Sequence, residues 1–125
     1  MQYENDEMPS FDQIYELSKG AFIKFLDKKL INNVNLKTDI YVDLDNKYIK
    51  LPKDKNELEV ISKDNFNKNL KFVLYETDLR LLKLLLQGPG FAHWNNAEIG
   101  SHIKFYRNPN IFEREVYGSM CYFHN

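Results

Sequence analysis

This chain of 125 residues carries 17 Lys and Arg side chains against 18 Asp and Glu side chains, a formal net charge of −1. Its length predicts one domain around a single core, and the balanced charge without a basic stripe argues against nucleic acid as a partner. The longest apolar run, at residues 84–86, is too short to span a membrane, and the acidic start is unlike a signal peptide, so we expect a cytoplasmic protein with no membrane span.

The first expected element is an amphipathic helix that follows a flexible start at residues 1–9, where polar residues show no periodicity. Ser10 and Gln13 have the spacing of a capping box, so we expect the helix to begin there. Gly20 would let another backbone approach this helix closely, and the Asn pair at 32–33 is a suitable helix end. Apolar residues recur every three or four positions and predict one buried face: Phe11, Ile14, Tyr15, Phe22, Phe25, Leu26 and Leu30.

Extended segments follow the helix. Residues 38–44 alternate strictly between apolar and polar side chains, which predicts a half-buried strand. An Asp-Asn pair at 45–46 separates this strand from a second extended run at 47–51, which predicts a hairpin. Residues 58–62 and 70–75 have strand character as well. We therefore expect a mostly antiparallel sheet of four to six strands.

A leucine-rich helix is expected next. Thr77 is a suitable N-cap, residues 79–87 contain six leucines, and Gly88 with Pro89 stops the helix. Its polar residues form one narrow stripe, and the rest of its surface therefore packs on the sheet: Arg80, Lys83 and Gln87.

The last part of the chain predicts a strand at 103–106 and a short helix at 112–117, followed by an extended piece at 120–123. A helix, then antiparallel strands, then helices are the order of an α+β fold. No repeat or shift in composition divides residues 10–125, which we take as a single domain.

Residues 88–101 are the segment with the densest chemistry. They hold the only Trp, two amides and a carboxylate, among glycines that allow unusual backbone shapes. His93, Glu98 and the adjacent His102 are metal-ligand types, but their spacing matches no compact ligand pattern. Gly100 also interrupts the helix that would bring Glu98 and His102 to one face. No metal ligand is assigned.

The same segment has two further interpretations. In the first, His93 and Trp94 pack against the leucine-rich helix, while Asn95, Asn96 and Glu98 satisfy backbone groups of an irregular turn. In the second, the segment recognises a ligand or a partner protein. The candidate binding residues are then His93, Trp94, Asn95, Asn96, Glu98, His102 and Arg107.

Catalysis has weaker support. Glu98 and His102 could act as a general acid and base, but the sequence has no nucleophile elbow, phosphate loop or dinucleotide fingerprint. Cys121 is the only cysteine and lies in an apolar stretch, where a thiol is normally inert packing. No catalytic residue and no cofactor are assigned.

Residues 81–123 resemble the carboxy-terminal part of bacterial metallo-β-lactamase-fold proteins similar to the CMP-N-acetylneuraminate hydroxylase group. The resemblance lies in the stretch Gly-Pro-Gly-Phe-Ala-His-Trp-Asn-Asn-Ala-Glu-Ile-Gly-Ser-His-Ile, the Arg-Asn-Pro turn at 107–109 and the Tyr-Phe-His ending. It implies an accessory domain. The metal-binding His-x-His-x-Asp-His run of that superfamily is missing from this sequence, so the resemblance assigns no metal ligand here.

The order of elements is also similar to that of sterol-carrier-protein-like domains, and this likeness implies a tunnel for a small apolar ligand. Here Phe22, Phe25, Leu82 and Leu86 would line the tunnel, or would simply fill it. Three hypotheses thus stay open: an accessory domain that recognises an adjacent catalytic domain or ligand, an apolar-ligand carrier, and a stand-alone enzyme. A cluster of aromatic residues near the end of the chain adds a homodimer as a second possible partner.

Overall fold

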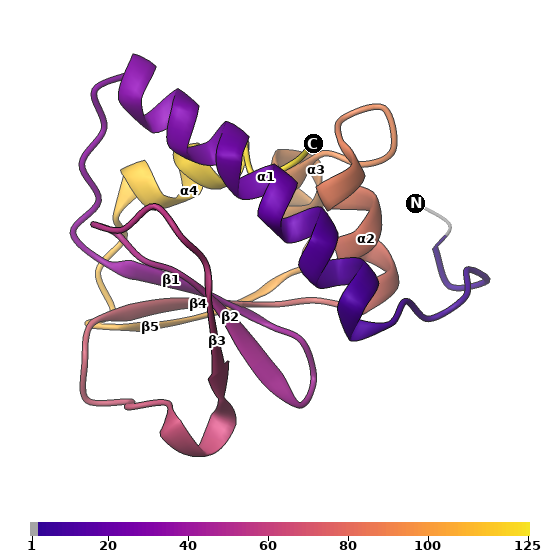
Figure 1. The fold of residues 1–125 in the computed structure, drawn as a ribbon, viewed down its shortest axis with the longest axis horizontal. Coiled ribbons are helices and arrows are strands. Elements are labelled where there is room, and N and C mark those ends of the chain that lie inside the picture. Colours follow the sequence, from indigo (N-terminus) through magenta and orange to yellow (C-terminus); the bar gives the residue numbers. More distant parts are fainter. Residues whose placement is uncertain (1–2) are drawn as a thin grey trace.

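The fold is α+β, as the sequence predicts, with helices gathered on one face of a five-stranded sheet (Figure 1). The computed structural model describes residues 3–125. Its strands are β1 (Asp39–Asp43), β2 (Lys47–Leu51), β3 (Glu59–Ser62), β4 (Phe72–Glu76) and β5 (Lys104–Asn108). Its helices are α1 (Phe11–Ile31), α2 (Leu79–Gln87), α3 (Trp94–Ile99) and α4 (Arg114–Met120), with a short 3-10 turn, η1 (Lys63–Asn65), between β3 and β4.

The strand order is β3-β2-β1-β4-β5, and every neighbouring pair is antiparallel except β1 and β4, which are parallel. The expected hairpin joins β1 to β2. Asp45 adopts a positive φ of 77°, and the Leu44 N–H donates to the Lys47 carbonyl at 2.8 Å. Because β2 and β3 are built outward from one edge of β1, β4 has only the other edge to occupy, and there it lies parallel to β1.

The first helix begins as predicted. Ser10 and Gln13 form both bonds of the capping box, and Asn32 caps the other end. The buried side chains lie three and four residues apart and face the sheet: Ile14, Ser18, Ala21, Phe22 and Phe25. Leu30 was predicted to be on this face and is instead 81% exposed, in the last turn of the helix.

The main core lies between the sheet and the four helices. Four leucines of α2 are fully buried there: Leu81, Leu82, Leu85 and Leu86. Ile40 and Val42 point into this core from β1, but Tyr41, on the opposite face of the strand, is only 8% exposed. The prediction that this strand is half-buried is therefore wrong. Tyr41 packs in a second apolar cluster, which Phe66 covers from the connection after β3.

Several boundaries differ from those expected, two of them for a clear physical reason. Asp78, not Thr77, caps α2, since its carboxylate accepts the Arg80 N–H while the Thr77 hydroxyl donates elsewhere, to the His102 carbonyl. The last helix runs to Met120, so the extended piece expected at 120–123 is a helix end followed by a turn. Phe123 there packs on Phe25 and Trp94, and these tertiary contacts fix the shape of the turn.

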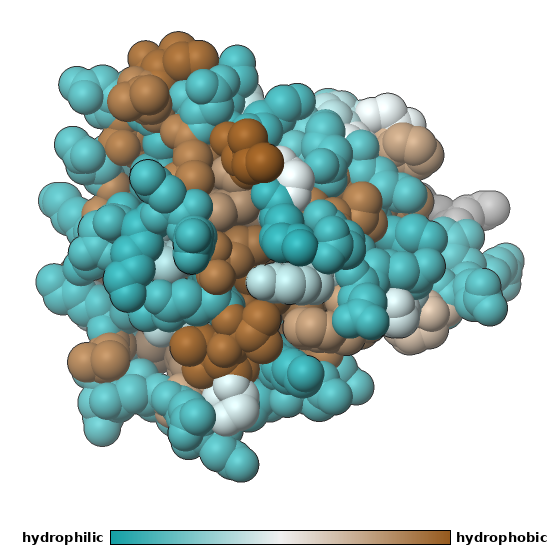
Figure 2. All heavy atoms as spheres, viewed as in Figure 1, coloured by the Kyte–Doolittle hydropathy of each residue, from teal (hydrophilic) through white to brown (hydrophobic). Residues whose placement is uncertain are grey.

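The start of the chain contacts the folded body. Residues 1–2 of the expected flexible start lie outside the described residues, but Tyr3 packs against the main core and the Glu4 carbonyl accepts a bond from Arg80. Within residues 3–125, no helix is both long and apolar enough to cross a membrane. Figure 2 shows hydrophilic side chains over most of one face, with apolar side chains gathered in separate areas.

Candidate functional site

The segment with the densest chemistry folds into a short helix, α3, and not into the irregular turn expected from its sequence. Two of its side chains, Trp94 and Ala97, are three residues apart and fully buried, so packing on the core favours the helix. Gly100 ends it by donating its N–H to the Asn96 carbonyl at 2.9 Å, and Ser101 then turns the chain with a φ of 60°.

This helix separates the predicted binding residues into four groups. The first group points outward: His93, Asn95 and Asn96 are exposed, and within residues 3–125 their side chains form no hydrogen bond. Two exposed apolar residues are close to them in the sequence, Phe91 at 60% in the turn before α3 and Ile99 at 76% in its last turn. We call these five residues the outer face of α3.

Trp94 belongs to the core. Its side chain is 2% exposed, its indole Nε1–H donates to the Phe123 carbonyl at 2.8 Å, and its ring meets Tyr75 edge-on at 5.7 Å. All of its polar capacity is used inside the protein. The Trp94 ring is therefore not accessible to a partner in this structure.

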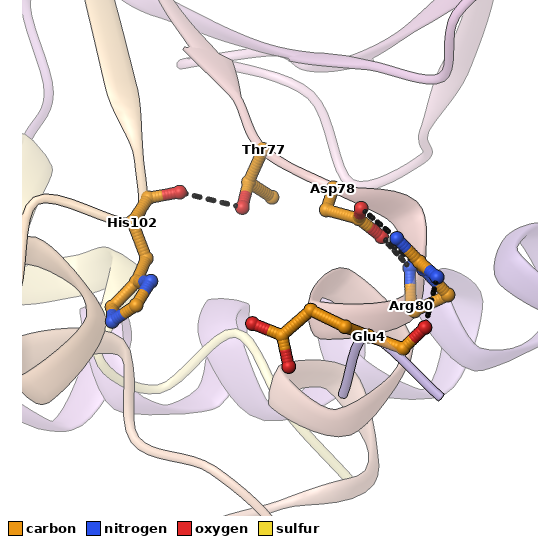
Figure 3. Close-up of polar contacts among 5 residues, drawn as sticks. All are labelled: Glu4, Thr77, Asp78, Arg80 and His102. Atoms are coloured by element: carbon orange, nitrogen blue, oxygen red, sulfur yellow. Dashed lines mark hydrogen bonds and ion pairs between the residues drawn. The ribbon is translucent and has the colours of Figure 1, made fainter. Parts of the chain in front are cut away.

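His102 has its ring beside Gly100 at the end of α3 and lines a different hollow from Glu98. Figure 3 shows its backbone carbonyl bonded to the Thr77 hydroxyl while its ring points away, and Tyr3 meets that ring edge-on at 6.2 Å. Asp78 and Arg80, close by in the same view, form an ion pair at 2.7 Å. Arg80 also donates to the Glu4 carbonyl, so it joins the start of α2 to the start of the chain. His102 lines a surface hollow of about 710 Å³ together with six charged residues: Asp43, Asp45, Lys63, Glu76, Asp78 and Lys104.

Glu98 and Arg107 form the fourth group and line a different hollow, of about 410 Å³. This hollow, which we call the Glu98 pocket, is bounded by α3, β5 and α4, and its other lining residues are Phe105, Asn110, Phe112 and Tyr117. The expected acid–base pair of Glu98 and His102 is therefore not assembled, because the two side chains line separate hollows.

The Glu98 carboxyl is poorly solvated. One of its oxygens, Oε1, is buried and has no hydrogen-bond partner among residues 3–125, and burial raises the pKa of the group from 4.5 to about 7. Near it lies the buried Tyr75 hydroxyl, also without a partner in the described chain. Burial, with a smaller contribution from the Glu98 charge, raises the pKa of Tyr75 well above 10 and also raises the pKa of the Cys121 thiol.

The sequence did not reveal Tyr75 and Tyr117 as neighbours of Glu98. Tyr75 lies in a strand whose sequence is typical of a buried strand. Tyr117 lies on α4, which begins two residues later than the sequence predicted. The one available signal was the cluster of aromatic residues near the end of the chain, to which Phe105, Phe112 and Tyr117 belong. That pattern is equally typical of ordinary packing.

No three His, Cys, Asp or Glu side chains of residues 3–125 lie close enough together to hold a metal ion. No protein-family model matches the chain, and no curated protein or solved structure is significantly similar to it. The metallo-β-lactamase and sterol-carrier resemblances therefore stay predictions from the sequence.

Proposed function

We propose that this protein is an accessory domain that recognises a partner protein through the outer face of α3. The observation that carries the proposal is the composition of this face: the exposed apolar side chains of Phe91 and Ile99 are close in the sequence to three exposed polar side chains that have no partner within residues 3–125. An apolar centre with polar neighbours is the usual make-up of a protein–protein interface.

The partner that we propose is a catalytic domain of the metallo-β-lactamase fold. This choice rests on the resemblance of residues 81–123, which contain the whole of α3 and its flanking turns. The apolar-carrier alternative has less support. Its expected tunnel residues, Phe22, Phe25, Leu82 and Leu86, are between 0% and 3% exposed and pack in the main core.

A direct binding measurement tests the proposal. The chain is titrated by calorimetry into a metallo-β-lactamase-fold catalytic domain of the CMP-N-acetylneuraminate hydroxylase group, taken from the same organism and lacking its own carboxy-terminal region. We expect a saturable complex that Phe91→Asp and Ile99→Asp each weaken by about tenfold or more, because a buried charge replaces an apolar contact.

Ile23→Asp is the matched control. Ile23 is similarly exposed, at 71%, but lies on α1, so this variant should bind like the natural chain. The proposal fails if no complex forms, or if all three variants bind equally well. It also fails if the chain is a stable homodimer by light scattering and Ile99→Asp makes it a monomer, because the outer face would then be occupied by a second copy.

A further inference from the structure

We propose that the Glu98 pocket binds a small zwitterionic ligand with an aromatic body, of the kind an aromatic amino acid represents. In this arrangement the ligand's ammonium group lies against Glu98, its carboxylate against Arg107, and its ring against the exposed ring of Phe112. The inference is independent of the proposed function, since it concerns the inner side of α3 and not its outer face.

The first argument is the unsatisfied carboxyl of Glu98. Burying a carboxylate oxygen without a hydrogen-bond donor is costly, and native structures rarely tolerate it without a functional reason. Glu98 Oε1 has no donor within residues 3–125, although the side chain lines an open hollow. A ligand ammonium group in this hollow would bring an opposite charge to the poorly solvated carboxyl.

The second argument is that hydrogen bonds orient the Arg107 guanidinium so that it can bind an anion. Its Nε–H donates to Asn110 Oδ1 at 3.0 Å, and its Nη1 donates to the Tyr117 hydroxyl at 3.0 Å. Its Nη2 makes no hydrogen bond to the described part of the chain. Because two bonds already fix the guanidinium plane, little side-chain entropy is lost when a ligand carboxylate binds the remaining donors.

The two charged groups are not neutralised by each other. Within residues 3–125, Glu98 and Arg107 form no ion pair, although they line one hollow. A pocket that holds a carboxylate and a guanidinium that do not pair with each other is complementary to a ligand that carries both a positive and a negative charge. A simple anion would satisfy only Arg107, and a simple cation would satisfy only Glu98.

The third argument is the aromatic lining. Phe112 stacks on Tyr117 with ring centroids 4.7 Å apart, and Phe105 meets Tyr117 edge-on at 5.4 Å. Phe112 is 61% exposed, so its ring forms a rim that leaves the pocket open to solvent. The volume of about 410 Å³ is in the range of small-molecule sites, which bury an apolar body between a few placed polar groups.

Calorimetric titration of the full chain with three related compounds tests the inference. L-Phenylalanine carries both charges, 3-phenylpropionate lacks the ammonium group, and phenethylamine lacks the carboxylate. We expect L-phenylalanine to bind at pH 8 and each of the other two to bind at least tenfold more weakly. Equal binding of all three compounds, or no heat of binding from L-phenylalanine, would overturn the inference.

Variants then locate the binding. Glu98→Gln keeps the size of its side chain and removes the charge, and Arg107→Gln removes the charge with a shorter polar side chain. Each should weaken L-phenylalanine binding at least tenfold, whereas the exposed loop variant Glu57→Gln should not change it. Circular dichroism checks that each variant is folded. Should a variant fail to fold, the comparison of the three ligands on the natural chain still decides the question.

The pH dependence gives a second readout. The groups that face Glu98 are Tyr75 from β4, Arg107 from β5, Tyr117 from α4, and Cys121, the residue that follows α4. Ionised Glu98 is the form that attracts an ammonium group, so L-phenylalanine affinity should rise severalfold between pH 6 and pH 8, around the pKa of about 7. Unchanged affinity over this range would contradict the role given to Glu98.

Discussion

At Gly20, α1 passes close to the end of the chain. A Cβ at this position would collide with the Asn125 side chain, whose amide donates to the Leu17 and Leu86 carbonyls, each at 2.9 Å. We expected another backbone to approach α1 at Gly20, but the neighbour is the Asn125 side chain. Gly20 therefore allows one residue to tie α1 to α2.

We predict opposite effects of replacing two helical glycines with alanine. Gly118→Ala should raise the free energy of unfolding by up to about 1 kcal/mol, because its new Cβ meets nothing within 4 Å. Gly20→Ala gains the same helix propensity but displaces Asn125, whose two hydrogen bonds are worth about 1 kcal/mol each, so it should lower stability by about 1 kcal/mol. Urea unfolding of both variants is the measurement. Stabilisation by Gly20→Ala would show that Asn125 moves aside freely.

Glu98 makes stability depend on pH. Its pKa is raised from 4.5 to about 7 in the folded protein, so the folded state binds the proton more tightly than the unfolded chain does. The stabilisation from the neutral carboxyl is thus fully present below pH 4.5 and is lost as the pH rises to about 7.

Glu98→Gln, which stays neutral, should therefore lose less stability than the natural chain between pH 5 and pH 8. Because the carboxyl is partly solvated, the difference at pH 8 should be on the order of 1 kcal/mol in favour of the variant. Urea unfolding at the two pH values measures it, with Glu57→Gln as the exposed control. Parallel pH profiles for Glu98→Gln and the natural chain would rule out an ionisable, buried Glu98.

Among the elements, the connection between β3 and β4 has a clear structural role. From it, Phe66 meets the rings of Tyr41, Tyr48 and Phe72 edge-on, each at a centroid distance of 4.9 Å. It thereby covers the sheet face that the helices leave bare. Edge-on contacts of this kind add to the free energy gained from burial alone.

Phe66→Ala should lower the free energy of unfolding by about 2 kcal/mol, less than for a fully buried Phe because Phe66 is only partly buried. Phe91→Ala is the matched control, since that side chain is 60% exposed, and it should change stability by less than about 0.5 kcal/mol. Chemical unfolding compares the two. Similar losses from both variants would mean that the second cluster contributes little.

The elements also show how far the sequence could be interpreted. Strong local signals gave the right answer: the capping box at Ser10, the Asp45 turn and the leucines of α2 are all where they were expected. The prediction for α3 was wrong because the helix is only 6 residues long, too short to be stable by itself. Packing of Trp94 on the core stabilises it, and that contact involves residues far away in the sequence.

At the scale of the whole molecule, the last residues hold the helices together. The Phe123 ring packs on Phe25 of α1 and on Trp94 of α3, and the Asn125 N–H donates to the Leu86 carbonyl of α2 at 2.7 Å. One short segment thus contacts three helices. Its loss should weaken the whole core and not only the end of the chain.

Phe123→Ala should accordingly lower the free energy of unfolding by about 3 to 5 kcal/mol, the usual range for a buried Phe. The neighbouring Tyr122→Ala should cost less than about 1 kcal/mol, because Tyr122 is 37% exposed and lies outside the core. Thermal and urea unfolding of the two variants give the comparison. A small loss from Phe123→Ala would show that the helices pack without this segment.

The sequence by itself determined the α+β class, the long capped helix, the hairpin and the leucine-rich helix, because each of these depends on contacts between residues near one another in the chain. Only the tertiary structure decided that β4 lies parallel to β1, that Tyr41 is buried, and that the binding residues expected around α3 face in different directions. Glu98 and Arg107 share a pocket because the fold brings residues of α3, β5 and α4 around one hollow, and burial, not spacing in the sequence, raises the pKa of Glu98.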